Sequence, residues 1–264
     1  MTLGEHVFLY CERGTNGALL AEPINAASNA GFLLAGLIGL VLVFRRPKEE
    51  QSADLFLIAA LIVLIGLGSL AFHLFATQAM ELADVVPIGV FMLVYLGFAL
   101  NRLLCVPPGW TVLIVIGFAA IVSVSTQLKC WAGAVGFPGP EVIGATECLN
   151  GSIGYLPALL AMFIVGALLR ERGHRAAPYI LWAAVIFTVS VGLRSLDMAL
   201  CGTLTFDGRK IGTHFAWHLL NALALFLLFK GALEAGAKGK GRGLAEPRST
   251  TGNRPGLGAL SESS

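Results

Sequence analysis

Seven long segments of the chain are almost entirely apolar, and short polar stretches separate them. A helix rises about 1.5 Å per residue, so about 20 apolar residues cross the hydrocarbon core of a bilayer, which is roughly 30 Å thick. The segments lack the alternation of β-strands, and backbone amides in lipid must be satisfied within the segment. We therefore predict an all-α, polytopic membrane protein, a bundle of seven transmembrane helices. The predicted spans are residues 22–44, 53–75, 80–104, 109–127, 152–169, 176–200 and 212–234.

The composition agrees with this class, because 56% of the 264 residues are hydrophobic and only 13% are charged. We divide the chain into an outer N-terminal segment at 1–21, the transmembrane domain at 22–235 and a cytoplasmic tail at 236–264. The tail is rich in Gly, Ser, Pro and charge and is predicted to be disordered. The first apolar run lacks the basic head and cleavage site of a signal peptide, so we expect nothing to be removed. The net charge of +2 carries no information about nucleic acid. We expect no nucleic-acid partner, and no partner protein is implied.

The distribution of Lys and Arg predicts the orientation in the membrane. Most of these residues fall in one set of loops, whereas the other set holds only Arg13, Lys129, Arg209 and Lys210. Positive loops mark the cytoplasmic side. The N-terminus is therefore predicted outside, on a periplasmic or lumenal side, and the C-terminus inside.

The cysteines fit this orientation. Cys11, Cys130, Cys148 and Cys201 all fall on the predicted outer side, where disulfides persist, and Cys105 is alone on the inner side. Four cysteines allow three pairings, and the sequence leaves the choice open. A bond between Cys130 and Cys148 would close the longest outer loop, and one between Cys11 and Cys201 would tie the N-terminal segment to the sixth span.

Ionisable residues are concentrated at the outer ends of three spans. The second span ends with Ser69 and His73, the third begins with Asp84, and the seventh begins with His214 and His218. Each of the pairs 69/73 and 214/218 is four residues apart and so shares one helix face. Such residues are costly in a bilayer and usually face the bundle interior, where they serve a function.

Three imidazoles near a carboxylate are the ligand set of a catalytic zinc, which leaves a fourth position for water. Asp84 would take a proton from that water, and the Ser69 hydroxyl would bond to the water or to the oxyanion formed from an amide or ester. Two alternatives remain. The histidines could bond between helices, or they could be axial ligands of a haem in an electron carrier.

Three motifs carry a resemblance to a known family. YCERG...AEPINAASN at 10–29, GLGSLAFHLFATQAMELADVVPI at 66–88 and GTHFAWHLLNAL at 212–223 resemble the signature regions of the alkaline ceramidases. Those enzymes belong to a superfamily of seven-helix membrane hydrolases that includes the progestin and adiponectin receptors. The resemblance covers residues 10 to about 230.

This resemblance implies an intramembrane zinc amidase that hydrolyses the N-acyl amide of ceramide-like lipids to a fatty acid and a long-chain base. The motifs match Ser69, His73, Asp84, His214 and His218 to the family's serine, first histidine, aspartate and paired histidines. The family's outward N-terminus agrees with the charge distribution. The alternative within the superfamily is a receptor or signalling scaffold with a structural zinc.

The resemblance also bears on calcium and on one disulfide. Cys11, Glu12 and Glu22 match a family calcium site, but Leu9 stands where a carboxylate is usual, which argues against a full calcium site. Asn25 and Asn29 continue a polar stripe from Glu22, either as caps and helix-bonding residues or in support of the zinc site. The family's N-terminal disulfide resembles a pairing of Cys11 with Cys201.

Three further polar residues lie near the outer ends of the fifth and sixth spans. Arg194 and Asp197 are three residues apart, so we expect them to pair with each other or with a neighbour, or to support the zinc site or a lipid headgroup. Tyr155 is either a donor to the substrate or an interfacial aromatic anchor.

Overall fold

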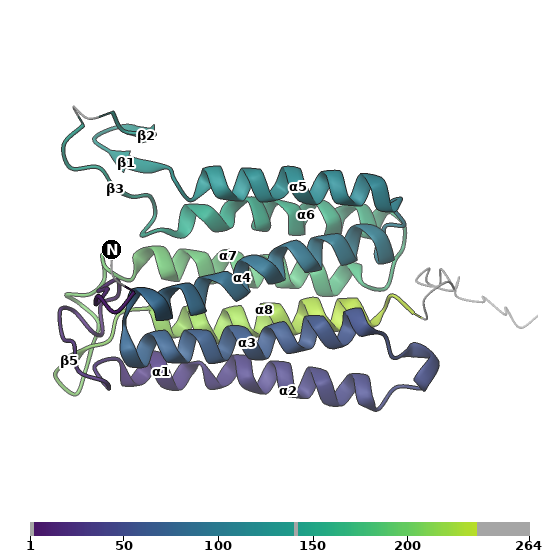
Figure 1. The fold of residues 1–264 in the computed structure, drawn as a ribbon, viewed down its shortest axis with the longest axis horizontal. Coiled ribbons are helices and arrows are strands. Elements are labelled where there is room, and N and C mark those ends of the chain that lie inside the picture. The colour runs from purple at the N-terminus through teal and green to yellow at the C-terminus, as the bar shows by residue number, and fades with distance from the viewer. Residues whose placement is uncertain (1–2, 140–141, 237–264) are drawn as a thin grey trace, which may run out of the picture.

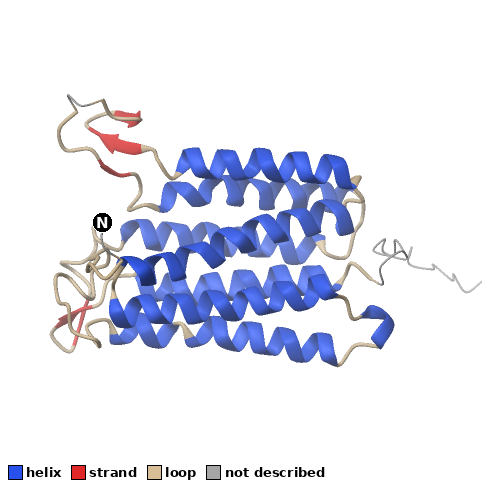
Figure 2. Cartoon of the chain, in the orientation of Figure 1, coloured by secondary structure: helices blue, strands red, loops and turns tan. Residues whose placement is uncertain are grey.

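The computed structural model describes residues 3–139 and 142–236, so most of the predicted tail lies outside the described residues. Seven helical spans run side by side, and the strands are confined to loops at the end of the bundle that also holds the N-terminus (Figures 1 and 2). All seven are long and apolar enough to cross a membrane. The predicted all-α, seven-helix class is therefore confirmed.

Several of the spans combine an α-helix with a second, shorter helical segment. The first span is α1 (Pro23–Ser28) with α2 (Ala30–Phe44), and η1 (Lys48–Glu50) follows it. The next spans are α3 (Ala53–Phe75), α4 (Gln78–Phe98) with the π-turn η2 (Ala99–Leu103), and α5 (Pro108–Ser125). The last three are η3 (Ser152–Tyr155) with α6 (Leu156–Glu171), α7 (Ala177–Leu196) and α8 (His214–Leu233).

The predicted spans agree closely with the helices, apart from a few residues at their ends. The largest difference is at the sixth span, predicted to reach residue 200, where α7 ends at Leu196 and turns follow. Hydropathy does not register this end because Met198, Ala199 and Leu200 are as apolar as the helix itself.

The spans form a closed ring in which each packs on the next and α8 packs on both α7 and α2. Burial is uneven around this ring. Within the most apolar 18-residue stretch of each span, 61% is buried in α8 and 56% in α3. In α5 the buried share is only 11%. The two most buried spans, α3 and α8, carry the three histidines.

The outer loops form two small sheets. In the first, β1 (Lys129–Trp131) pairs antiparallel with β2 (Ala134–Gly136) and β3 (Thr146–Glu147), with Cys130 opposite Val135 and Thr146. The second is the hairpin of β4 (Thr205–Phe206) and β5 (Arg209–Lys210).

Two disulfides tie this end of the molecule together. Cys130 bonds to Cys148 and Cys11 to Cys201, so the first pair closes the outer loop and the second joins the N-terminal segment to the chain after α7. Cys105 is free and exposed. The second pairing is the one that the family resemblance implied.

The N-terminal segment folds back over the ends of α3 and α4. The main-chain N–H of Val7 donates to the Ala76 carbonyl at 2.8 Å, and that of Gln78 donates to the Glu5 carbonyl at 3.0 Å. Tyr10, Cys11 and Arg13 are buried in consequence, although they lie before the first span.

Candidate metal centre

Three histidine side chains meet at the outer end of the bundle. His73 lies in the last turn of α3, and His214 and His218 lie in the first turns of α8. Each offers a ring nitrogen, and these three atoms lie within 4.8 Å of one another. All three residues are at most 1% exposed. The two helices thus bring together the three histidines that the sequence singled out.

In His73 and His218, the Nδ1 atom makes a hydrogen bond, and this bond fixes which ring nitrogen carries the hydrogen. His73 Nδ1 is 2.5 Å from Glu22 Oε2, and a carboxylate oxygen can only accept, so Nδ1 donates. His218 Nδ1 is 2.7 Å from Ser28 Oγ, whose own hydroxyl donates to the Asn25 carbonyl at 2.7 Å. The hydroxyl oxygen therefore accepts from His218. In the neutral rings both Nε2 atoms are left with a bare lone pair.

These two lone pairs face each other, since His73 Nε2 and His218 Nε2 are only 3.2 Å apart. Two acceptors cannot bond, so a shared proton or a cation is required between them. Two nitrogens on a tetrahedral zinc with bonds of about 2.0–2.1 Å are roughly 3.3 Å apart. In addition, the buried Nδ1 of His214 lacks a hydrogen-bond partner in the described part of the chain. The donor set therefore fits a zinc ion held by His73, His214 and His218.

Asp197 holds the backbone at the start of α8. Its Oδ1 accepts from the main-chain N–H groups of Thr213 at 2.7 Å and His214 at 3.0 Å, and its Oδ2 accepts from Cys11 N at 2.9 Å. A carboxylate at a helix N-terminus is favourable because it meets free N–H groups and the positive end of the dipole. Gly212, at φ 60°, leaves room for this carboxylate, since a Cβ there would lie 2.1 Å from Oδ1.

The side chains of Arg194 and Asp197 bond to different partners rather than to each other. Arg194 donates to the Asn150 carbonyl at 2.7 Å, to Ser152 Oγ at 2.9 Å and to the Tyr10 hydroxyl at 3.3 Å. Its guanidinium also lies over the Tyr155 ring, 5.4 Å from the centroid. Arg194 thus anchors the outer loop before α6, while Asp197 positions His214.

Tyr10 forms a wall of the centre that sequence reasoning passed over. Its ring stacks on His214 with 3.5 Å between centroids and lies 5.4 Å from that of His73. Burial raises the pKa of the Tyr10 phenol, so the hydroxyl stays neutral. Sequence reasoning also missed Arg13, which bonds to the His73 carbonyl, and Ser28, which bonds to His218. All three stood inside quoted motifs, but a contact with a histidine about 60 or 190 positions away leaves no local signal.

Ser69 and Asp84 lie beside a close contact between α3 and α4. Both are buried, at 3% and 8% exposed. A Cβ on Gly68 would lie 1.9 Å from the Ala83 carbonyl oxygen, so only glycine permits this contact. Pro87 has no N–H to donate to that carbonyl four residues earlier. The freed carbonyl and the glycine together bring Asp84 to the helix that carries Ser69 and His73.

Glu12, Glu22 and Asn25 form hydrogen bonds with the start of α1, with one another and with His73. Glu12 accepts from the main-chain N–H groups of Ile24 and Asn25, both at 2.8 Å, at the start of α1. Burial raises the pKa of Glu12, and these two N–H groups oppose the effect. Glu22 accepts from Asn25 Nδ2 at 3.0 Å as well as from His73. Glu22 and Asn25 therefore support His73 and the α1 helix.

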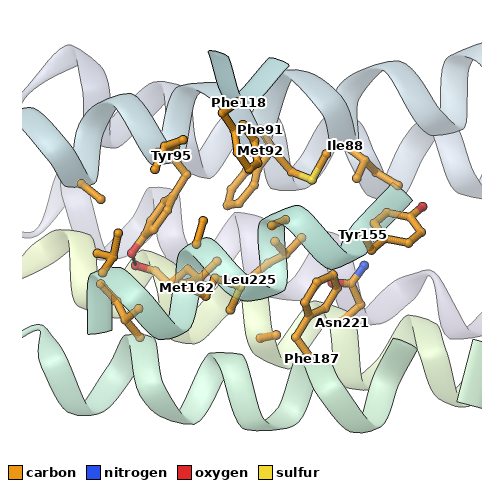
Figure 3. A pocket seen from close by; sticks show the side chains of 18 of the residues that line it. Ile88, Phe91, Met92, Tyr95, Phe118, Tyr155, Met162, Phe187, Asn221 and Leu225 are labelled. Carbon is orange, nitrogen blue, oxygen red and sulfur yellow. Dashed lines mark hydrogen bonds between the residues drawn. The ribbon is translucent and has the colours of Figure 1, made fainter. Parts of the chain in front are cut away.

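An apolar cavity begins one helical turn from the metal centre. It lies between α4, α6, α7 and α8. Figure 3 shows Asn221 and Tyr155 at one end and Tyr95 at the other, with Phe91 and Met162 between them. Tyr95 donates to the Leu228 carbonyl at 2.8 Å. Since Asn221 follows His218 by three residues on α8, the cavity leads away from the histidines along the bundle interior.

Comparison with known proteins agrees with this architecture. No match was found among curated proteins. The family model described as Ceramidase matches residues 10–241, which include the N-terminal motif at 10–29, all seven spans and the three histidines. Membership supports amide hydrolysis of ceramide in general. From the N-terminal motif to the end of α8, the chain belongs to the ceramidase family.

Proposed function

We propose that the protein is a zinc-dependent amidase that hydrolyses the N-acyl amide of ceramide-like membrane lipids. The observation that carries the proposal is the pair of bare Nε2 atoms of His73 and His218, 3.2 Å apart in a buried cluster with His214. Zinc held there would act as a Lewis acid and lower the pKa of a water molecule.

The protein's own residues supply the proton transfers. Asp84 is the proposed general base, which takes a proton from the attacking water and returns it to the leaving amine. Ser69 is the proposed hydrogen-bond donor to the oxygen of the amide as negative charge develops on it. Both lie in a buried region, where the low dielectric strengthens these interactions.

The apolar cavity is the proposed binding site for a hydrocarbon chain of the substrate. Its lining is aliphatic and aromatic, and its polar groups lie at the ends, as Asn221, Tyr155 and Tyr95 do in Figure 3. Apolar pockets with a few polar groups are typical of lipid and small-molecule sites. Tyr155, beside Arg194 at the outer end, is proposed to contact the polar part of the lipid.

The active site is proposed to face the outer side, with the N-terminus outside and the C-terminus cytoplasmic. The loop distribution of Lys and Arg supports this orientation. Cys105 would then be cytoplasmic, so a membrane-impermeant thiol reagent should label it only after the cells are permeabilised. Labelling of Cys105 in intact cells would show that the orientation is the opposite of the one proposed.

The test is incubation of the detergent-purified protein with a panel of N-acyl lipids, with release of fatty acid measured by mass spectrometry. Zinc content is measured on the same samples. We expect His73→Ala to lose both zinc and turnover. His174→Ala, which changes a loop histidine at the other end of the bundle, should retain both. Bound zinc without turnover on any lipid would favour the receptor with a structural zinc, and a Soret band would favour haem.

A further inference from the structure

The guanidinium of Arg13 lies inside a shell of five oxygen atoms. Nε donates to Glu22 Oε1 at 2.5 Å. Nη1 donates to the carbonyls of Asn16 at 3.0 Å and Ala18 at 2.9 Å. Nη2 donates to the carbonyls of His73 at 2.7 Å and Leu74 at 3.4 Å. A guanidinium has five N–H groups, so every donor of this side chain has a partner.

This positive charge is fully buried, since the Arg13 side chain is 0% exposed and that of Glu22 is 2% exposed. A buried charge is costly unless it is paired and all its hydrogen bonds are made, and here both conditions hold. Two of the accepting carbonyls belong to the last turn of α3, where carbonyls are free and the helix dipole favours a cation.

Arg13 also reaches His73 along two routes. It bonds to the main-chain carbonyl of His73 directly, and it bonds to Glu22, whose other oxygen accepts from His73 Nδ1 at 2.5 Å. The guanidinium bonds to one oxygen of Glu22, and the other oxygen of that carboxylate accepts from the ring. That hydrogen bond fixes the tautomer of His73 that leaves Nε2 free, and partners of this kind orient metal-binding histidines.

Carbonyl and carboxylate oxygens in such number are the ligands that a calcium ion takes. Here they surround a side chain that carries the positive charge itself. Glu12, the nearby carboxylate that could add to such a site, bonds instead to the N–H groups at the start of α1. The N-terminal segment therefore holds a cation that is covalently part of the chain.

We propose that Arg13 is a built-in cation that positions Glu22 and His73 for the metal centre and removes any need for a bound calcium ion in the N-terminal segment. The proposal rests on the proposed zinc site. It makes Arg13 a positioning residue, which acts through Glu22 and His73 and does not touch the substrate.

The test measures zinc affinity by competition with a chelator, without substrate, in the intact purified protein. Arg13→Ala and Glu22→Gln should each weaken zinc binding by about 10–100-fold, the usual effect of losing a partner of a metal ligand. The double variant should lose little more than the weaker-binding single variant, because both act through one chain of contacts. Arg13→Lys keeps the charge but has only three donors, so its zinc affinity should fall between wild type and Arg13→Ala.

Arg102→Ala is the matched control. Arg102 also bonds to a carboxylate, that of Asp54, and to a main-chain carbonyl, that of Gly236 at 3.0 Å, but at the inner end of the bundle. The Arg102→Ala variant should have a lower melting temperature but the same zinc affinity in the folded protein. If Arg13→Ala behaves in the same way, Arg13 is only structural and the proposal is wrong.

Calcium binding to the wild type is measured by equilibrium dialysis with radioactive calcium and by the melting temperature with and without millimolar calcium. We expect no saturable binding and no shift in melting temperature, and this result stands even if Arg13→Ala fails to fold. Saturable calcium binding that stabilises the wild type would overturn the proposal. A wild type that binds no zinc would instead overturn the proposed function, so the two failures are distinguishable.

Discussion

At the scale of single residues, the proposed zinc ligands and the proposed base lie on different helices. The histidine nitrogens converge on one point, whereas Asp84 reaches the region from α4. A carboxylate that serves as a general base contributes about 10²–10⁴-fold to the rate. The proposed ligands and the proposed base can therefore be removed separately.

Asp84→Asn tests this separation. The amide has nearly the same size and polarity but cannot take a proton, so turnover should fall at least about 100-fold, the lower end of the usual contribution of a general base. Zinc content should stay at the wild-type level. Turnover is read from fatty-acid release and zinc from elemental analysis of one preparation. An active Asp84→Asn protein would remove Asp84 from its role as base.

Ser28 is a second separable residue, because it meets the centre through the hydrogen bond that it accepts from His218 Nδ1. Ser28→Ala leaves that N–H unpaired, which should weaken zinc binding by about 10–100-fold. Ser125→Ala is the control, since Ser125 bonds to a carbonyl of its own helix at an exposed position of α5. Equal zinc affinity in the two variants would show that the Ser28 contact does not orient His218.

At the scale of elements, the position of α4 depends on the absence of a side chain at Gly68. The backbone of α4 at Ala83 fills the space where a Cβ would be, and Asp84 is the next residue. A methyl group at Gly68 must push the helices apart, and overpacking of this kind costs about 1–3 kcal/mol or more.

Gly68→Ala is therefore expected to lower the melting temperature and to reduce turnover more than zinc content, since it displaces the base rather than the ligands. Gly117→Ala is the control. It lies on α5, where an added Cβ has no neighbour within 4 Å among the described residues. There the substitution should be neutral or stabilising by about 0.5–1 kcal/mol, the usual helix preference for alanine. Thermal unfolding and fatty-acid release measure both effects.

Elements and ligands differ in how far the sequence predicts them. The spans follow from hydropathy because each must cross the same thickness of lipid. His73, His214 and His218 could be predicted because histidines are rare in lipid and these three lie at one depth. Arg13 and Ser28 could not, because their contacts depend on how the N-terminal segment and α1 fold over α3 and α8. The strands of the outer loops were equally hidden, since they are only two or three residues long.

At the scale of the whole molecule, the N-terminal segment acts as a cap that is held at two places. Residues 5–7 pair with the turn between α3 and α4, and Cys11 is bonded to Cys201 after α7. Tyr10, Glu12 and Arg13 lie beside that cysteine and contact His214, the start of α1 and His73, respectively. The disulfide therefore joins the two sides of the metal centre across 190 positions of sequence.

Removing this bond should loosen the cap and with it the metal. The Cys11→Ser, Cys201→Ser double variant is expected to lose about 2–5 kcal/mol of stability. It should also release zinc at lower chelator concentration, because Tyr10 and Arg13 are no longer held against the histidines. The Cys130→Ser, Cys148→Ser variant removes a disulfide that closes only the outer loop. It should lower the melting temperature without changing zinc release. If both variants released zinc alike, the cap would hold the metal centre no more than any other outer loop does.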